Sequence, residues 1–241
     1  MIVQACINGA HPEAYHPSLP LTHEAMVADA AECIAAGAGE LHIHPRDSDG
    51  KESLAHVDEL VRGIRSVCPG TLVGVSTGAW IENDITLTRH RINEWSSLPD
   101  YASVNLSEPD APAIFSLLEA KGVGIEAGIA TVEDAERFVS LRQRDKVFRV
   151  LFEIEQQDLR QARATLAGIQ TVLNEAGVQR PILLHGFDAT VWHFVREARV
   201  KRWSTRIGLE DGCRLEDQSV ASSNAQLVAK AIALFQEQSV A

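Results

Sequence analysis

The stretch THEAMVADAAECIAAGAGELHIHPRD, residues 22–47, predicts a helix followed by a short strand. Thr22 is a good N-cap, and Glu24 lies in the first turn of the predicted helix. The alanine-rich run ends at Gly37, a residue typical of helix C-termini. Residues Glu40–His44 then predict a strand. Helices that alternate with short strands are typical of the βα units that build parallel sheets.

The same alternation recurs along the whole chain. Eight strands are expected, at Ile2–Asn8, Glu40–His44, Leu72–Ser76, Tyr101–Asn105, Gly122–Glu126, Phe148–Glu153, Ile182–His185 and Ser204–Gly208. A helical pattern follows each of them, and the clearest later ones are Thr131–Arg142, Asp158–Glu175, Asp188–Val200 and Ser222–Gln238. The last helix has apolar residues at Leu227, Ala231 and Leu234, which suits an element of an outer ring.

Eight βα pairs in 241 residues, at about 30 residues per unit, are close to the lower end of the size range of (β/α)₈ barrels. A doubly wound open sheet is the competing fold. No G-x-G-x-x-G motif follows the first strand, however, and the first and last strands are suited to pair with each other. No linker or charge block divides the chain. We therefore expect an α/β protein, a single-domain TIM barrel over residues 1–241, with its active site at the carboxyl ends of the strands.

Composition excludes several classes of function. The chain has 33 acidic and 22 basic residues, and its net charge of −11 argues against binding to nucleic acid or to an anionic membrane surface. No apolar run approaches the roughly 18 residues that cross a bilayer, and the first residues lack the positive start of a secretory signal. Four scattered cysteines are too few for a disulfide framework. We expect a cytoplasmic protein with small-molecule partners.

The strongest local signal is the His42-x-His44 pair, which Arg46 and Asp47 follow. Side chains two residues apart on a strand point to the same side, so both imidazoles are expected to face the interior at the mouth of the barrel. Two neutral imidazoles held in this way bind a divalent metal, and a nitrogen-rich site with open positions favours Zn²⁺. The alternative is a pair of hydrogen-bonded core histidines.

Glu210 is the expected third metal ligand. Arg206 and Glu210 have the same parity at the end of the eighth strand, which only the first strand separates from the His pair in a closed barrel. A metal with two His ligands usually takes a carboxylate as well. The alternative is an ordinary solvated loop, because Asp and Gly are common in turns.

Short polar side chains end two further strands, at Ser76-Thr77-Gly78 and at Ser103-Val104-Asn105. Such groups beside a glycine can bind a carboxylate, although they are also the commonest turn residues. Glu126 is expected at the end of the fifth strand, where a buried carboxylate is costly unless it binds something.

Three histidines have open assignments. His185, at the end of the seventh strand, is a candidate metal ligand, acid or base, or hydrogen-bond partner of another site residue. His11 and His16, with Glu13 between them, lie in the loop after the first strand, above the predicted metal site. They contact the substrate or cap a proline-rich turn.

Seven segments together resemble the β-keto acid cleavage enzymes, in the same order as in that family. They are Ile7-Asn8-Gly9-Ala10, Leu19-Pro20-Leu21-Thr22, Ala36-Gly37-Ala38 with His42-Ile43-His44-Pro45-Arg46-Asp47, Val75-Ser76-Thr77-Gly78, Ala102-Ser103-Val104-Asn105, Arg206-Ile207-Gly208-Leu209-Glu210-Asp211 and Ser223-Asn224-Ala225-Gln226-Leu227-Val228.

The resemblance implies a Zn²⁺-dependent barrel in which acetyl-CoA and a β-keto acid give acetoacetate and a new acyl-CoA. It implies that His42, His44 and Glu210 bind the metal, and that Arg206 and Asp211 deprotonate the substrate. The substrate-binding residues that it implies are Glu13, Ser76, Thr77, Gly78, Ser103, Asn105 and Glu126, with Glu126 at the variable end of the substrate. It also favours a homo-oligomer.

The chain departs from the family after the sixth strand. The family has a Gly- and Pro-rich loop there, whereas this chain runs Leu151-Phe152-Glu153-Ile154-Glu155-Gln156-Gln157 into a helix, with no glycine to bring the backbone close to a ligand. In the family, this loop belongs to the expected CoA site, so the difference affects the prediction of that site.

Three other functions compete with this one. An amidohydrolase-like hydrolase needs its H-x-H on the first strand and histidines on middle strands, but no His occurs between Arg91 and Leu184. A sugar-phosphate isomerase or aldolase predicts a strand Lys, and none of the expected strands has one. A non-catalytic metal- or carboxylate-binding barrel would not need Arg206 and Asp211.

Overall fold

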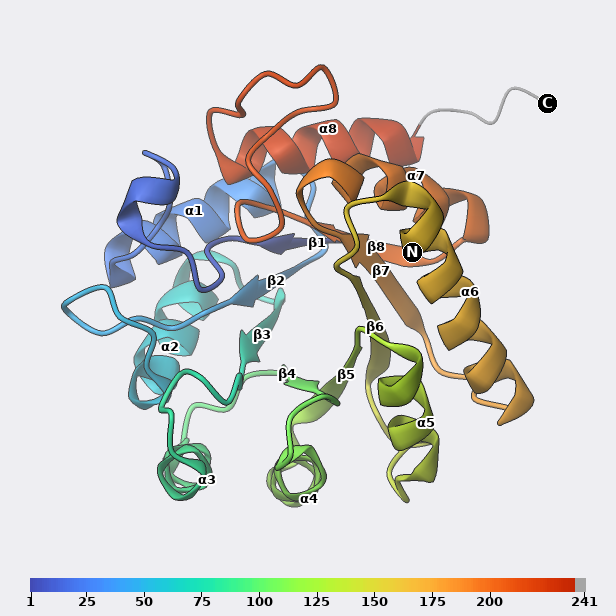
Figure 1. Cartoon of the computed structure of the whole chain (residues 1–241). Helices are drawn as coiled ribbons and strands as arrows, with labels where there is room; N and C mark the ends of the chain where they lie inside the picture. Colours follow the sequence, from blue (N-terminus) through green and yellow to red (C-terminus); the bar gives the residue numbers. More distant parts are fainter. Residues whose placement is uncertain (237–241) are drawn as a thin grey trace.

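The computed structural model describes residues 1–236. In this part of the chain, eight parallel strands form a closed barrel in sequence order, and eight α-helices surround it (Figure 1). The barrel closes where β8 pairs with β1, with Gln4 opposite Arg206. The predicted TIM barrel is confirmed, and the open doubly wound sheet is excluded.

The element bounds are close to the predicted ones. The strands are β1 Val3–Cys6, β2 Glu40–Ile43, β3 Leu72–Ser76, β4 Tyr101–Asn105, β5 Gly124–Ile129, β6 Arg149–Ile154, β7 Ile182–Gly186 and β8 Ser204–Ile207. The α-helices are α1 His23–Ala35, α2 Val57–Val67, α3 Ile85–Glu94, α4 Ala111–Lys121, α5 Val132–Ser140, α6 Leu159–Glu175, α7 Val191–Lys201 and α8 Asn224–Gln236. Residues 237–238 of the predicted last helix lie outside the described residues.

Side-chain caps start the helices where the sequence predicts them. The Thr22 side chain accepts a hydrogen bond from the Ala25 amide at 3.2 Å, which fixes the first turn of α1. Thr131 and Asp134 form a reciprocal capping box at the start of α5. Residues Asp188–Thr190 form a 3₁₀ turn before α7, so this helix begins three residues later than expected.

The predicted bounds of the fifth strand were wrong. Gly122 adopts a left-handed conformation, with φ at +73°, and ends α4, so β5 begins only at Gly124. The strand then continues to Ile129. Glu126 consequently lies in the middle of the strand and not at its carboxyl end.

A charged cluster fills the lower barrel interior. Arg149 of β6 forms ion pairs with Glu40 of β2 and with Glu126 of β5, the second at 2.5 Å. Gln4 donates to the Tyr101 hydroxyl at 2.8 Å and to Glu126 at 3.3 Å. These side chains are buried. The barrel core below the active site is therefore polar, while the layer between strands and helices is apolar.

No helix among residues 1–236 has the length and apolar character needed to span a membrane.

Candidate active site

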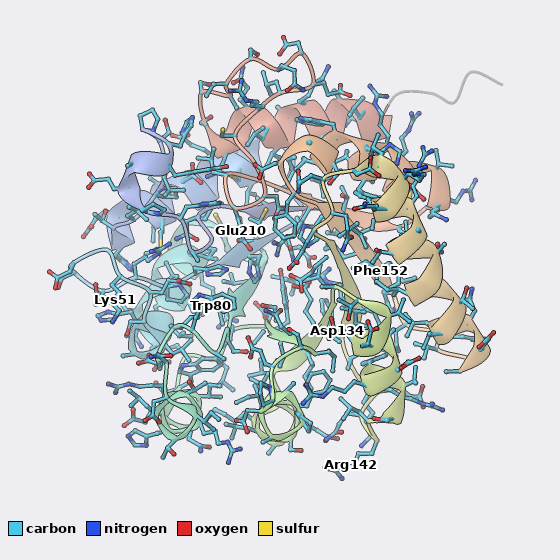
Figure 2. All side chains as sticks on the ribbon, viewed as in Figure 1. Lys51, Trp80, Asp134, Arg142, Phe152 and Glu210 are labelled. Carbon is cyan, nitrogen blue, oxygen red and sulfur yellow. The ribbon has the colours of Figure 1, made fainter. Side chains whose placement is uncertain are left out.

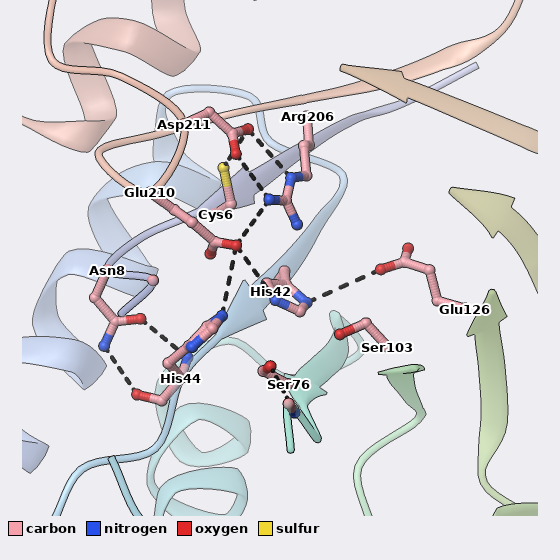
Figure 3. Close-up of polar contacts among 12 residues, drawn as sticks. Cys6, Asn8, His42, His44, Ser76, Ser103, Glu126, Arg206, Glu210 and Asp211 are labelled. Atoms are coloured by element: carbon pink, nitrogen blue, oxygen red, sulfur yellow. Dashed lines mark hydrogen bonds and ion pairs between the residues drawn. The ribbon is translucent and has the colours of Figure 1, made fainter. Parts of the chain in front are cut away.

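His42, His44 and Glu210 meet at the mouth of the barrel (Figure 3). His42 lies on β2, His44 directly follows it, and Glu210 follows β8. The Nε2 atoms of His42 and His44 lie 3.7 and 3.5 Å from the same oxygen, Oε1 of Glu210. Two ligands of a tetrahedral ion at about 2.1 Å lie about 3.4 Å apart. The spacing therefore fits a Zn²⁺ site, as the sequence pattern predicts.

The protonation of His42 and the environment of Glu210 also suit a metal. Burial lowers the pKa of His42 to about 4, against the attraction of Glu210, so its imidazole is neutral. The second oxygen of Glu210, Oε2, is buried and has no hydrogen-bond partner among the described residues. A buried carboxylate oxygen without a donor is costly, and a cation would satisfy it.

Two side chains fix His44 in place. The Asn8 amide accepts from the His44 backbone N–H and donates to its carbonyl oxygen, both at 2.9 Å. The Nδ1 atom of His44 lies 2.5 Å from Glu52 Oε1, and Trp80 Nε1 donates to Glu52 Oε2 at 3.0 Å. Because Glu52 occupies Nδ1, the Nε2 atom of His44 is the one that faces Glu210.

Arg206 joins Glu210 to Asp211. Its Nη2 donates to Glu210 Oε1 and to Asp211 Oδ1, both at 2.7 Å, and its Nε donates to Asp211 Oδ2 at 3.1 Å. The Cys6 thiol donates to the same Asp211 Oδ2 at 3.0 Å. Burial raises the pKa of Asp211, but Arg206 and His185 outweigh it and lower that pKa overall. Asp211 is thus held as a carboxylate.

A cavity of about 370 Å³ opens above these residues. Its wall contains His42, His44, Arg206 and Glu210, and from neighbouring strands Ser76, Ser103 and Asn105. Trp80, Asp134 and Glu210 come from different sides of the barrel mouth (Figure 2). The structure therefore brings together most of the predicted site residues, at the carboxyl ends of the strands.

Four of the predicted substrate-binding residues lie elsewhere. Glu13 is exposed on the 3₁₀ turn Glu13–Tyr15, and His11 lines the cavity in its place. Thr77 points away from the cavity, because its hydroxyl donates to the Ser103 carbonyl at 2.7 Å. Gly78 lies under the Trp80 ring. Glu126 lies below the cavity, paired with Arg149, and its Oε2 is 4.0 Å from His42 Nδ1.

His185 lies between two carboxyl groups. Its Nδ1 is 3.3 Å from Asp211 Oδ1, and its Nε2 is 3.9 Å from Glu153 Oε1. Burial lowers the pKa of His185 and Arg206 lowers it further, against the attraction of Asp211. This position of His185 favours contact with Asp211 over metal binding. His16 lies outside the site, where its Nε2 atom forms a hydrogen bond with the Ala221 carbonyl.

Sequence reasoning missed Glu52, Trp80, Glu153 and Phe187. The last three line the cavity, and Glu52 supports His44. Glu52 and Trp80 lie on loops, where no periodic pattern predicts the direction of a side chain. A carboxylate in the barrel-facing parity of the sixth strand was a signal for Glu153, because charged residues inside a barrel are rare without a role.

The chain is similar in sequence to two enzymes of known name. The 3-oxoadipate:acetyl-CoA acetyltransferase of Cupriavidus necator is 27% identical, over 98% of this chain and 88% of that protein. The 3-keto-5-aminohexanoate cleavage enzyme of Acetoanaerobium sticklandii is 35% identical over 81 residues, which cover 32% of this chain and 30% of that enzyme.

Among solved structures, ObcA in complex with a C4-CoA adduct and oxalate superposes with a TM-score of 0.72 and 18% identity. The match covers 88% of this chain and 62% of ObcA, and it shows the shared fold. A family model described as beta-keto acid cleavage enzyme matches residues 1–240. The chain therefore belongs to the beta-keto acid cleavage enzyme family.

Proposed function

We propose that this protein is a zinc-dependent β-keto acid cleavage enzyme that uses acetyl-CoA as co-substrate. Its products are acetoacetate and the CoA thioester of the remaining acyl group. The observation that carries the proposal is the convergence of both His Nε2 atoms on one oxygen of Glu210, which Arg206 links to Asp211. The family and the Cupriavidus relative, an acetyl-CoA acetyltransferase by name, support the same chemistry.

A Zn²⁺ ion held by His42, His44 and Glu210 would supply Lewis-acid polarisation of the keto group. The chain itself binds and orients the substrate. Ser76, Ser103 and Asn105 offer hydrogen-bond donors to its oxygens.

The Arg206–Asp211 pair receives the proton from the carbon between the two carbonyl groups. Arg206 faces the cavity and fixes the Asp211 carboxylate through two hydrogen bonds. The resulting enolate carbon attacks the acetyl-CoA carbonyl and releases CoA thiolate. The thiolate then attacks the original keto carbon, the carbon–carbon bond breaks, and the acetoacetate carbanion takes up a proton.

The direct test combines metal analysis with mass-spectrometric assays of β-keto acids, with and without acetyl-CoA. We expect one equivalent of zinc and CoA-dependent cleavage. Asp211→Asn is expected to lower kcat by about 10²- to 10⁴-fold, because the base is lost. Glu210→Gln is expected to lose zinc as well as activity.

Asp217→Asn is the matched control, because Asp217 is an exposed carboxylate on the same loop. Zinc with water-only chemistry would favour an amidohydrolase-like hydrolase, and zinc with no turnover would favour a metal-binding barrel. A protein without metal would contradict the proposal.

We also propose a cytoplasmic location and a homo-oligomeric assembly. The four cysteines are free thiols, which suits a reducing compartment. Light scattering on the purified protein tests the assembly.

A further inference from the structure

Glu153 presents a carboxyl group to the active-site cavity that the proposed reaction does not use. It is an inward-facing residue of β6, it lies opposite His185 of β7, and its side chain is 17% exposed. Among residues 1–236, no side chain or backbone N–H donates a hydrogen bond to it, and the nearest cationic candidate, His185 Nε2, is 3.9 Å from Oε1. A largely buried carboxyl group without a donor is costly unless a ligand supplies one.

The carboxyl group of Glu153 packs against a glycine, whose missing side chain makes room for it. Gly128 of β5 lies between Glu153 and Asn105 of β4. A methyl group on Gly128 would collide with Glu153 Oε2 and would lie 2.7 Å from Asn105 Oδ1. Both side chains therefore place polar atoms around the small volume next to Gly128, and all three residues line the cavity.

Contacts connect this volume to the proposed reaction centre. Glu153 approaches His185, His185 approaches Asp211 at 3.3 Å, and Asp211 binds Arg206. The metal ligands and Glu153 also line the same cavity. A keto acid bound at His42, His44 and Glu210 would thus occupy the cavity that Glu153 also lines.

Acidic side chains lie around this volume, and none of the described residues there supplies a free cation. Glu155, which follows β6, lines the same side of the cavity as a second carboxylate. Arg206 is the one Arg or Lys among the described residues of the cavity wall, and it is already bound to Glu210 and Asp211. Burial raises the pKa of Glu153 to about 8, against the opposing effect of Arg206, and nearby carboxylates add to the increase. A positive ligand group would relieve this unfavourable environment.

We propose that Glu153 is a specificity-determining residue that selects β-keto acids with an ammonium group at the end remote from the metal ligands. An ammonium group donates hydrogen bonds to Glu153 and to the Asn105 oxygen and is attracted by Glu155. A carboxylate tail would lose its hydration beside two acidic side chains. The inference rests on the proposed function and names the substrate class of the same site.

The test compares three 3-oxo acids of similar length that end in ammonium, methyl or carboxylate, the last being 3-oxoadipate. In the presence of acetyl-CoA, we expect kcat/KM to fall in that order, by about tenfold or more between ammonium and methyl, as for a charge-assisted hydrogen bond. Glu153→Gln is expected to reduce the ammonium-to-methyl ratio by about tenfold to 100-fold, mainly through KM. Glu153→Leu should reverse the preference.

Glu136→Gln is the control, because Glu136 is an exposed carboxylate on α5 and should leave the ratio unchanged. Calorimetric titration with the ammonium- and methyl-ended acids, without acetyl-CoA, measures the same preference as binding alone. Efficient cleavage of all three acids, or an unchanged ratio in Glu153→Gln, would overturn this inference and leave the proposed function intact. Failure to bind or cleave any of them would overturn both.

Discussion

Glu52 uses its two oxygens for different partners. Oε1 faces His44 Nδ1 at 2.5 Å, and Oε2 accepts from the Trp80 indole. Although burial lowers the pKa of His44, the carboxylates of Glu210 and Glu52 raise it to about 9. A carboxylate on one imidazole nitrogen orients the ring and makes the other nitrogen a stronger ligand. Glu52 is therefore a positioning residue for the proposed metal site.

We expect Glu52→Ala to weaken zinc binding by about 10- to 100-fold, as is typical when such a partner is removed. Competition with a chromophoric chelator measures the affinity. Glu59→Ala is the control, since Glu59 is 61% exposed on α2. An affinity within threefold of the unmodified protein would exclude this role for Glu52.

At the scale of elements, Asn224 ties the start of α8 to the barrel. Its Oδ1 accepts from the Leu209 N–H at 2.7 Å, and its Nδ2 donates to the Ile7 carbonyl and to Asp29 of α1, both at 2.8 Å. The loops after β1 and β8 carry His11 and Glu210. Asn224 therefore holds both loops against α1 from below the active site.

The protonation of Asp29, which Asn224 contacts, makes the stability of the folded protein depend on pH. Burial raises the pKa of Asp29 to about 7, although the Asn224 hydrogen bond opposes the shift. The folded state thus retains a proton that the unfolded chain releases near pH 4, and stability falls as pH rises from about 4 to 7. Asp29→Asn should remove this slope and stabilise the protein at pH 8 by on the order of 2 kcal/mol.

Urea unfolding at pH 5 and pH 8 measures the effect. Asp29→Ala, which also loses the contact with Asn224, should not gain the same stability. An equal pH slope in the Asp29→Asn variant would show that Asp29 is ionised in the folded state throughout this range.

The sequence predicts elements better than side-chain contacts. The His42 and His44 positions follow from strand parity, and Glu210 follows from the adjacency of β8, β1 and β2, so pattern alone predicts this group. Glu126 was misplaced because β5 continues for three residues beyond it, to Ile129, and the apolar pattern did not mark that end. Glu52 escaped prediction because its position depends on a loop that folds back over His44.

At the scale of the whole molecule, ion pairs in the barrel interior connect the strands in addition to apolar packing. Arg149 contacts the carboxylate of Glu126 on the neighbouring strand β5 and, across the interior, the carboxylate of Glu40 on β2. Burial raises the pKa of Glu40 despite this partner, whereas Arg149 and His42 keep that of Glu126 below its ordinary value. Through Glu40, Arg149 thus links β6 to β2, two strands that are not neighbours in the sheet.

Arg149→Met should destabilise the protein by about 3–5 kcal/mol, because it leaves two carboxylates buried without their cation. The loss should shrink at acidic pH, where these groups are protonated. Urea unfolding measures both effects. Arg196→Met, at a half-exposed ion pair with Glu216, should cost less than about 1 kcal/mol. Equal losses in the two variants would show that the interior cluster contributes no more than a surface pair.

The interior cluster also constrains how this barrel can diverge. Glu40, Arg149 and Glu126 are far apart in sequence, yet replacing Arg149 leaves two carboxylates in the core without their cation. Replacing all three by apolar residues of similar volume removes that penalty. Descendants of this sequence should therefore keep the three residues or exchange them as a set, so that a lineage which loses Arg149 comes under selection to lose both carboxylates.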